Sequence, residues 1–154
     1  MPSITITDFA CIKQASFDLA PVTIIIGPQG SGKSLTTKLF YFFNDILLSH
    51  IKSTETDLSE DEFKKLIARQ FCQWFPPAAW GNKRFNISFN GGEFSALVLR
   101  KMSGGKPADD VAVSFSDWFS KLYRRSRERY RDARDAHNQA SDRASQFSHS
   151  LDTD

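Results

Sequence analysis

A glycine-rich stretch near the start of the chain constrains the fold more than any other feature. It reads Gly27-Pro28-Gln29-Gly30-Ser31-Gly32-Lys33-Ser34 and fits the pattern G-x-x-x-x-G-K-[ST] at every fixed position. The β-branched run at residues 22–26 that precedes it is typical of a strand buried on both faces. Residues 35–48 follow without Gly or Pro and predict a helix. Strand, glycine loop and helix form the context in which this pattern binds phosphate.

The residue types in this stretch suit a polyphosphate ligand. Glycines let consecutive backbone N–H groups turn toward phosphate oxygens, and a helix that begins near Lys33 adds its positive N-terminal dipole. We expect ATP and Mg²⁺ as ligands, with Lys33 on the β- and γ-phosphates as the catalytic residue and the Ser34 hydroxyl on the metal. The expected site comprises Gly27, Pro28, Gln29, Gly30, Ser31, Gly32, Lys33, Ser34 and Leu35. The alternative is a glycine-rich turn that happens to end in Gly-Lys-Ser.

Length and composition favour one α/β domain. A chain of 154 residues with 40% hydrophobic content can bury one core but hardly two. Its net charge of +2 gives no general argument for nucleic acid binding. Cys11 and Cys72 lack metal-ligand spacing and no signal peptide precedes them, which indicates reduced thiols in a cytoplasmic protein. The apolar helix that follows the glycine loop carries too many polar residues to span a membrane, so we expect a soluble protein.

Two alternating segments precede the glycine loop and predict half-buried strands. Ile4 and Ile6 alternate with threonines, and Ala15, Phe17 and Leu19 alternate with Ser16 and Asp18. Small P-loop kinases usually have no such hairpin ahead of the loop.

The residues up to the glycine loop resemble the opening of ABC-type ATPases. The resemblance rests on the runs at residues 6–9, 12–13, 17–19 and 22–34 and covers residues 4–45. The similar members are SMC, RecF and OLD-like proteins, including ATPases of bacterial anti-phage systems. Two departures stand out: Gln29 replaces the usual Asn, and Ala10 occupies a position where many relatives carry a basic residue that helps hold nucleotide. Lys13 is a substitute for that residue, or the contact is absent.

After a polar loop at residues 53–59, Ser59 and Glu62 have capping-box spacing at the start of a second helix. Its apolar stripe consists of Phe63, Leu66, Ile67, Phe71, Trp74 and Phe75, and Pro76-Pro77 ends it. Such a stripe normally faces a core, and we favour that interpretation. The alternative is a stacking platform for bases or adenine.

A strong hairpin pattern follows, with alternating apolar residues on both sides of Asn90-Gly91-Gly92. The resembling ATPases have an antiparallel β-subdomain at this point. Residues 102–106, Met-Ser-Gly-Gly-Lys, are similar to the ABC signature Leu-Ser-Gly-Gly-Gln. We interpret them as a turn between two strands, because Pro107 and the alternating residues after it cannot open the required helix.

From Trp118 onward the chain has no Gly or Pro and predicts a long, weakly packing helix. Its heptad seam consists of Phe119, Tyr123, Ser126, Tyr130, Ala133, His137, Ala140, Ala144, Phe147 and Leu151. We interpret His137 as a tolerated interface residue and not as a ligand. A basic surplus on this helix consists of Arg124, Arg125, Arg127, Arg129, Arg131 and Arg134, together with Lys121. It is either a solvated face or a contact with DNA phosphates.

The catalytic parts of a complete ATPase are missing. No apolar run ends in Asp-Glu, the nearest candidate being residues 111–117, and no Gln lies between Gln73 and Gln139 to serve as the Q-loop. In the resembling class the signature and the acidic strand follow a helical insertion. We therefore expect a P-loop ATPase lobe at residues 1–115 and the start of a coiled-coil or helical insertion at 116–154.

Two hypotheses follow. In the first, the chain is the ATP-binding half of a switch that acts with DNA or a nuclease partner and hydrolyses ATP as a homodimer or with a completing C-terminal lobe. In the second, it is a non-catalytic nucleotide-binding or interaction module. A small-molecule P-loop kinase is a weaker third, because no substrate lid with arginines is recognisable.

Overall fold

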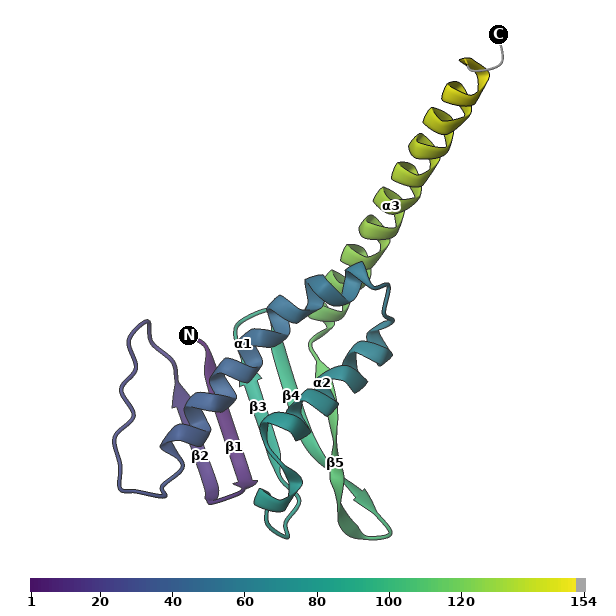
Figure 1. Cartoon of the computed structure of the whole chain (residues 1–154). Coiled ribbons are helices and arrows are strands. Elements are labelled where there is room, and N and C mark those ends of the chain that lie inside the picture. The colour runs from purple at the N-terminus through teal and green to yellow at the C-terminus, as the bar shows by residue number, and fades with distance from the viewer. Residues whose placement is uncertain (152–154) are drawn as a thin grey trace.

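The computed structural model describes the backbone of residues 1–151 and the side chains of residues 1–141. The fold is α/β, with one antiparallel sheet of five strands in the order β2-β1-β3-β4-β5. Helices α1 and α2 cover one face of this sheet, and α3 projects away from it (Figure 1). The elements are β1 (Ser3–Phe9), β2 (Ile12–Asp18), α1 (Lys33–Glu55), α2 (Glu60–Trp74), a 3₁₀ turn (Pro77–Ala79), β3 (Asn86–Asn90), β4 (Ser95–Ser103), β5 (Lys106–Phe115) and α3 (Asp117–Leu151).

The register of the sheet places one apolar row against the helices. Ile6 of β1 lies opposite Ala15 of β2 and Ile87 of β3, and both isoleucines are fully buried. Thr5 and Ser88 alternate with them on the other face, where they are only half-buried. The N-terminal strands and the later hairpin expected from alternation are therefore confirmed.

Aromatic rings form much of the core between the sheet and the helices. Phe43 of α1 stacks on Phe89 of β3 with ring centroids 5.3 Å apart. Phe63, Ile67 and Phe71 of α2 are all fully buried. The apolar stripe of α2 thus belongs to the core, as favoured from its spacing, and cannot be a stacking platform for bases.

The second helix begins as its sequence predicts. The Glu62 N–H group donates to Ser59 Oγ at 3.3 Å, and the Ser59 N–H group donates to Glu62 Oε2 at 2.8 Å. The expected loop at residues 53–59 is partly wrong, because α1 continues to Glu55. The Ser53 and Thr54 hydroxyl groups donate to the carbonyl oxygens of Ser49 and Ile51 within the last turns of this helix.

The turn expected at residues 102–106 connects β4 and β5. Gly104 and Gly105 both have positive φ, at 55° and 77°. This segment closes a hairpin and does not open a helix, so the predicted turn is confirmed.

The predicted buried strand at residues 22–26 is wrong. These residues are not in a strand, and the exposed fractions of Val22, Ile24 and Ile26 are 80%, 78% and 89%. A strand needs a neighbour to accept and donate its backbone hydrogen bonds. Within the described residues the sheet ends at β2, and this segment pairs neither with β2 nor with another strand.

Helix α3 packs on the core through its base. Phe119 and Tyr123 are fully buried in the core, whereas Tyr130 and every later described residue on the seam, including His137, are exposed. Ala144, Phe147 and Leu151 of the predicted seam lie outside the described side chains. No helix in the described residues is long and apolar enough to cross a lipid bilayer.

Candidate functional site

The glycine loop turns into α1 at Gly32. Gly32 has φ 92° and ψ 6°, a left-handed conformation that side-chain-bearing residues rarely adopt. A β-carbon on this glycine would also lie 2.6 Å from Ile12 Cγ1 of β2. The positive φ and the close approach to Ile12 both favour glycine at this position. The close approach places the start of α1 against the hairpin of β1 and β2.

The N-terminus of α1 is open to an anion. Thr36 is the first residue whose N–H group donates into the helix, to the Gly32 carbonyl at 2.9 Å. Among the described residues, no acceptor is found for the N–H groups of Lys33, Ser34 and Leu35. No side chain caps this end, and its first turn contains no acidic residue. These backbone donors and the helix dipole therefore all favour a negatively charged ligand.

The start of α2 gives a comparison within the same chain. There Ser59 caps the helix, and three acidic residues, Glu60, Asp61 and Glu62, occupy its first turn. At the N-terminus of α2, the Ser59 side chain accepts a hydrogen bond from the Glu62 N–H group, and the acidic residues supply negative charge. Of these two helix starts in the described residues, only that of α1 favours an anion.

Lys33 is folded back onto the glycine loop. Its Nζ donates to the carbonyl oxygens of Gly27 and Pro28, each at 2.5 Å. The ammonium group thus lies within the loop that the sequence motif assigns to phosphate. Phosphate oxygens are stronger acceptors than carbonyl oxygens, so a bound polyphosphate would compete for this group.

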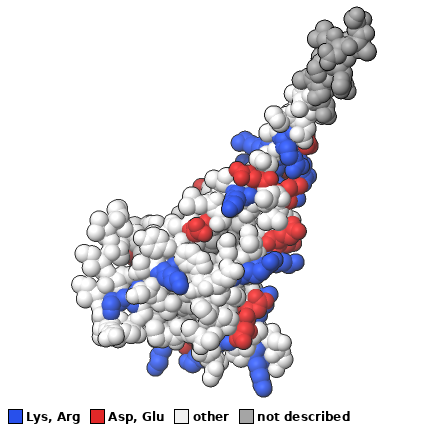
Figure 2. Space-filling model, viewed as in Figure 1, with Lys and Arg blue, Asp and Glu red and all other residues white. Residues whose placement is uncertain are grey.

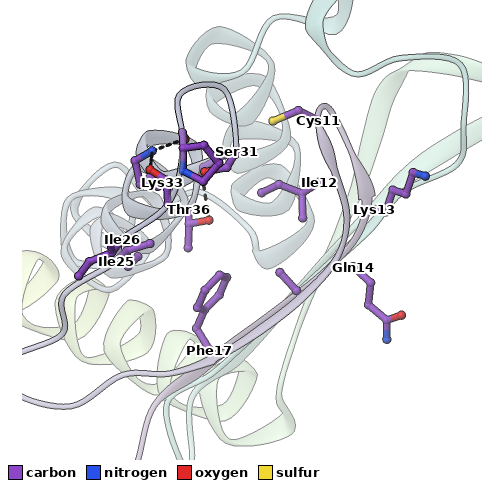
Figure 3. Close-up of a pocket in the computed structure, with 14 residues that line it drawn as sticks. Cys11, Ile12, Lys13, Gln14, Phe17, Ile25, Ile26, Ser31, Lys33 and Thr36 are labelled. Carbon is purple, nitrogen blue, oxygen red and sulfur yellow. Dashed lines mark hydrogen bonds between the residues drawn. The ribbon is translucent and has the colours of Figure 1, made fainter.

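A hollow of about 500 Å³ lies between the glycine loop and β2. Figure 3 shows Ile12 and Phe17 pointing into it from β2, while Lys33 and Ser31 lie on the side of the loop. Ile25 and Ile26 line it on the side of the loop as well, so apolar side chains and the Lys33 ammonium group border the same hollow. This lining suits a ligand with an apolar part and a charged part.

Several expected site residues lie around this hollow and others do not. Gly27, Pro28, Ser31, Gly32 and Lys33 line it. Gln29 and Gly30 are exposed at the tip of the loop. Ser34 faces a separate hollow beside α1, and its hydroxyl makes no hydrogen bond within the described residues. Lys13 is at the rim on β2, but Figure 3 shows its side chain directed away from Lys33.

Ile12, Phe17 and Thr36 are among the lining residues that were not identified as site residues from the sequence. The alternation of Ala15 and Phe17 with polar residues predicted a half-buried strand. Both residues lie on the same face of β2, which is the face that the glycine loop approaches. Thr36 could have been found from the helical period after Lys33. Its hydroxyl donates to the Gly32 carbonyl at 3.1 Å and reinforces the first turn.

The acidic residues of β5 lie far from the glycine loop. β5 is at the opposite edge of the sheet from β2, with three strands between them. Asp109 accepts a hydrogen bond from Arg100 at 3.3 Å, and Asp110 accepts one from Lys101 at 2.5 Å. The hydrogen bond from Lys101 lowers the pKa of Asp110 below its usual value. Neither carboxylate is placed to act on a ligand bound at α1.

The basic residues at the base of α3 are partly neutralised within the chain. Arg127 Nε donates to Asp57 Oδ1 at 2.7 Å, and Arg131 donates to both carboxylate oxygens of Asp57 at 3.0 Å. The hydrogen bond from Arg131 is the largest contribution to lowering the pKa of Asp57. Figure 2 shows blue and red side chains intermixed along this part of the helix. Asp57 therefore holds two of the six arginines against the α1–α2 loop.

Comparison with family models, with curated proteins and with solved structures gave no match to this chain in any of the three. Within the described residues, no group of three or more His, Cys, Asp or Glu side chains is arranged to hold a metal ion. A magnesium ion would therefore need ligands from a nucleotide and from water in addition to Ser34.

Proposed function

We propose that this chain binds ATP with Mg²⁺ through residues 27–35 and serves as the nucleotide-binding lobe of an ABC-type ATPase. The observation that carries the proposal is the uncapped N-terminus of α1, which begins at a glycine loop with the Lys33 ammonium group inside it. An uncapped helix end, a glycine loop and a lysine in this order suit a nucleotide polyphosphate.

In this proposal, each part of the site has a separate role. The Lys33, Ser34 and Leu35 N–H groups hold phosphate oxygens, and Lys33 moves from the loop carbonyls to the β- and γ-phosphates. Ser34, which lies at the separate hollow beside α1, would contribute its hydroxyl to Mg²⁺, and the metal would supply positive charge against the phosphates. Phe17, in the apolar wall of the hollow, offers its ring to the base.

The lobe acts as a switch and not as a complete enzyme. Hydrolysis needs a carboxylate beside the attacking water and donors for the developing charge on the γ-phosphate. The carboxylates of β5 are on the far edge of the sheet. A second lobe, supplied by another chain or by another part of a longer one, provides both. Following the resemblance, we propose DNA or a nuclease as the partner and anti-phage defence as the setting.

A titration with a fluorescent ATP analogue tests the binding proposal. Replacing Lys33 by Ala removes a charge-assisted contact worth roughly 1.5–3 kcal/mol, so affinity should fall about 10- to 100-fold. Lys106→Ala, at the exposed first residue of β5, is the matched control and should leave affinity unchanged. Equal affinities of the wild-type and Lys33→Ala chains would refute the site.

A non-catalytic nucleotide-binding or interaction module is the second candidate, favoured by the distance of the acidic residues of β5 from the glycine loop. We test it in its nucleotide-binding form. Both candidates predict nucleotide binding. They differ in whether any added lobe brings about hydrolysis, which a phosphate-release assay measures.

A further inference from the structure

Lys38 joins α1 to the C-terminal end of α2. Its Nζ donates to the carbonyl oxygen of Trp74, the last residue of α2, at 2.5 Å and lies 5.2 Å from the centroid of the Phe75 ring. The two helices cover the same face of the sheet and run in opposite directions, so that the end of α2 approaches the first turns of α1 (Figure 1). Lys38 therefore connects the helix that begins at the glycine loop with the end of the next helix.

The C-terminal end of α2 receives its positive charge from this contact. Its own last turn contains no basic residue. The residues after it, Phe75 and Pro76, lack the left-handed conformation that commonly ends a helix. A cation at this end is favourable because the last carbonyl groups carry partial negative charge. Lys38 supplies the cation from α1, and the Trp80 indole N–H group donates to the next carbonyl, that of Phe75, at 2.8 Å.

Lys38 also lies close to the expected phosphate site. Together with Ser34 it lines a hollow of about 490 Å³, of which Thr37, Tyr41 and Trp74 form the rest. Ser34 and Lys38 are four residues apart and so lie on the same face of α1, and helical side chains tilt toward the N-terminus. Four residues rise about 6 Å along a helix, which the flexible four-carbon stem of lysine can span. The ammonium group can thus turn to the Trp74 carbonyl or toward Ser34.

We infer that Lys38 senses the terminal phosphate of the nucleotide, leaving the Trp74 carbonyl for this phosphate in ATP and staying on α2 with ADP. This inference rests on the proposed function, because it assigns a further positioning residue to the same site. A phosphate oxygen is charged and is therefore a stronger acceptor than a carbonyl oxygen. A ligand shifts an equilibrium only when it interacts differently with the two states, and ADP lacks the phosphate that would do so.

The movement of Lys38 has a consequence for α2. The Trp74 carbonyl loses its donor, and the C-terminal end of the helix loses its positive charge. The Phe75 N–H group, which closes the last turn by donating to the Phe71 carbonyl at 2.8 Å, should then open more often. The Trp74 ring packs on Phe42 with centroids 5.9 Å apart and borders the hollow, so its surroundings change as well. One side chain thus links the terminal phosphate to residues 74–80.

Competition titrations test the sensor. Unlabelled ATP and ADP displace a fluorescent ATP analogue from the full chain in the presence of Mg²⁺. Lys38→Met removes a charged hydrogen bond to ATP only, so ATP affinity should fall about tenfold or more, while ADP affinity stays within about twofold. Lys38→Arg keeps the charge and should keep the preference for ATP. Lys52→Met, at an exposed lysine farther along α1, is the matched control and should behave like wild type.

Either of two results in these titrations would overturn the inference. Unchanged ATP affinity in Lys38→Met would show that Lys38 does not contact the phosphate. Equal losses for ATP and ADP would show that the residue acts only through the stability of the fold.

Hydrogen exchange and tryptophan fluorescence test the movement itself. ATP should speed exchange at the Phe75 amide and change the fluorescence of the chain, whereas ADP should do neither. In Lys38→Met exchange at Phe75 should be fast without nucleotide, and ATP should add nothing. Trp74→Phe should remove the fluorescence response, because Trp80 is buried and Trp118 lies on α3. Exchange at Phe75 that responds equally to ATP and ADP, or to neither, would contradict the sensor.

Lys33→Ala separates this inference from the proposed function. Lys33 serves the β-phosphate, which both nucleotides carry, so Lys33→Ala should weaken ATP and ADP alike. If Lys33→Ala weakens both and Lys38→Met weakens neither, the sensor is wrong and the proposed function stands. If the wild-type chain binds neither nucleotide, both are wrong.

Discussion

Gly32 lies against Ile12 so closely that a β-carbon on the glycine would be 2.6 Å from Ile12 Cγ1 and 2.8 Å from Ile12 Cδ1. This contact joins the last glycine of the loop to the first residue of β2. The start of α1 is thereby fixed relative to the sheet. Lys33 is the next residue, so the same contact also fixes where its backbone lies.

The first prediction concerns this contact. Gly32→Ala should destabilise the fold, because alanine in the left-handed region costs roughly 1–2 kcal/mol and its methyl group also displaces Ile12. Gly105→Ala is the matched control, since Gly105 has φ 77° with nothing within 4 Å of the added carbon. Thermal unfolding of both variants measures the difference. Equal losses of stability would show that the contact with Ile12 contributes nothing.

The second prediction concerns Asp57, whose carboxylate accepts hydrogen bonds from Arg127 and Arg131. The arginines lower its pKa in the folded chain below the ordinary value of 3.8. The stabilisation is therefore complete above about pH 4 and is lost as the pH falls through the lowered pKa. Asp57→Asn keeps a residue that tolerates the positive φ of 55° while removing the charge. It should lower the melting temperature at pH 7, and the difference from wild type should shrink in acid.

The exposed carboxylate of Asp132, farther along α3, provides the control. Asp132→Asn should melt like wild type at pH 7. A difference between Asp57→Asn and wild type that did not depend on pH would contradict the ion-pair explanation.

The third prediction concerns Tyr123, which is fully buried and donates its hydroxyl hydrogen to the Leu58 carbonyl at 3.0 Å. Burial raises the pKa of Tyr123 to about 12. The buried, protonated Tyr123 therefore stabilises the fold fully below about pH 10, which is the pKa of tyrosine in the unfolded chain. This stabilisation is lost as the pH rises toward 12. In an ultraviolet titration of the folded chain, the ionisation of Tyr123 should therefore appear as a late step, at about pH 12.

Substitution tests the same hydrogen bond. Tyr123→Phe should cost about 1 kcal/mol of stability and remove the last step of the titration. If the last step persisted in Tyr123→Phe, the late-ionising phenol would be another tyrosine.

The fourth prediction separates the two roles open to the arginines of α3. Arg125 and Arg129 make no ion pair within the described residues, whereas Arg127 and Arg131 hold Asp57. If this helix contacts DNA phosphates, Arg125→Gln with Arg129→Gln should reduce the salt slope of binding by up to about 2. Arg127→Gln with Arg131→Gln changes the net charge equally, but should mainly lower the melting temperature. A salt slope that neither pair changes would identify the basic run as a solvated face.

Local sequence patterns were sufficient to predict most of the helices and strands. The capping residues Ser59 and Glu62 located the start of α2, and the two prolines after Phe75 located its end. Strict alternation around Ile4 and Ile6 identified β1. These features depend on residues near one another in the chain, and pattern reasoning detects them well.

Residues 22–26 show where such reasoning fails. Their β-branched side chains favour a strand, but a strand also needs a neighbour, and no pattern within five residues reveals whether one exists. The candidate site was only partly predictable for the same reason. The loop from Gly27 to Ser34 is continuous in sequence, whereas Phe17 enters the site through the packing of β2 beside the loop.

The last prediction is that the described chain binds ATP without turning it over. The loop, Lys33 and the α1 N–H groups hold ATP in its ground state as well as in the transition state, and equal binding of both does not lower the barrier. The carboxylates of Asp109 and Asp110 face Arg100 and Lys101 at the far edge of the sheet. Phosphate release should stay at the level of the Lys33→Ala control, and should rise only when a lobe that supplies a carboxylate and γ-phosphate donors is added.

Ordinary turnover that Lys33→Ala abolishes would contradict this expectation. The catalytic carboxylate would then be within the chain, and Asp109→Asn, Asp110→Asn and Asp117→Asn would identify it. If the residue were Asp109 or Asp110, a second copy of the chain would have to bring β5 to the glycine loop, because three strands separate β5 from β2. Turnover should in that case rise with the square of protein concentration at low concentration, whereas a site within one chain gives a linear dependence.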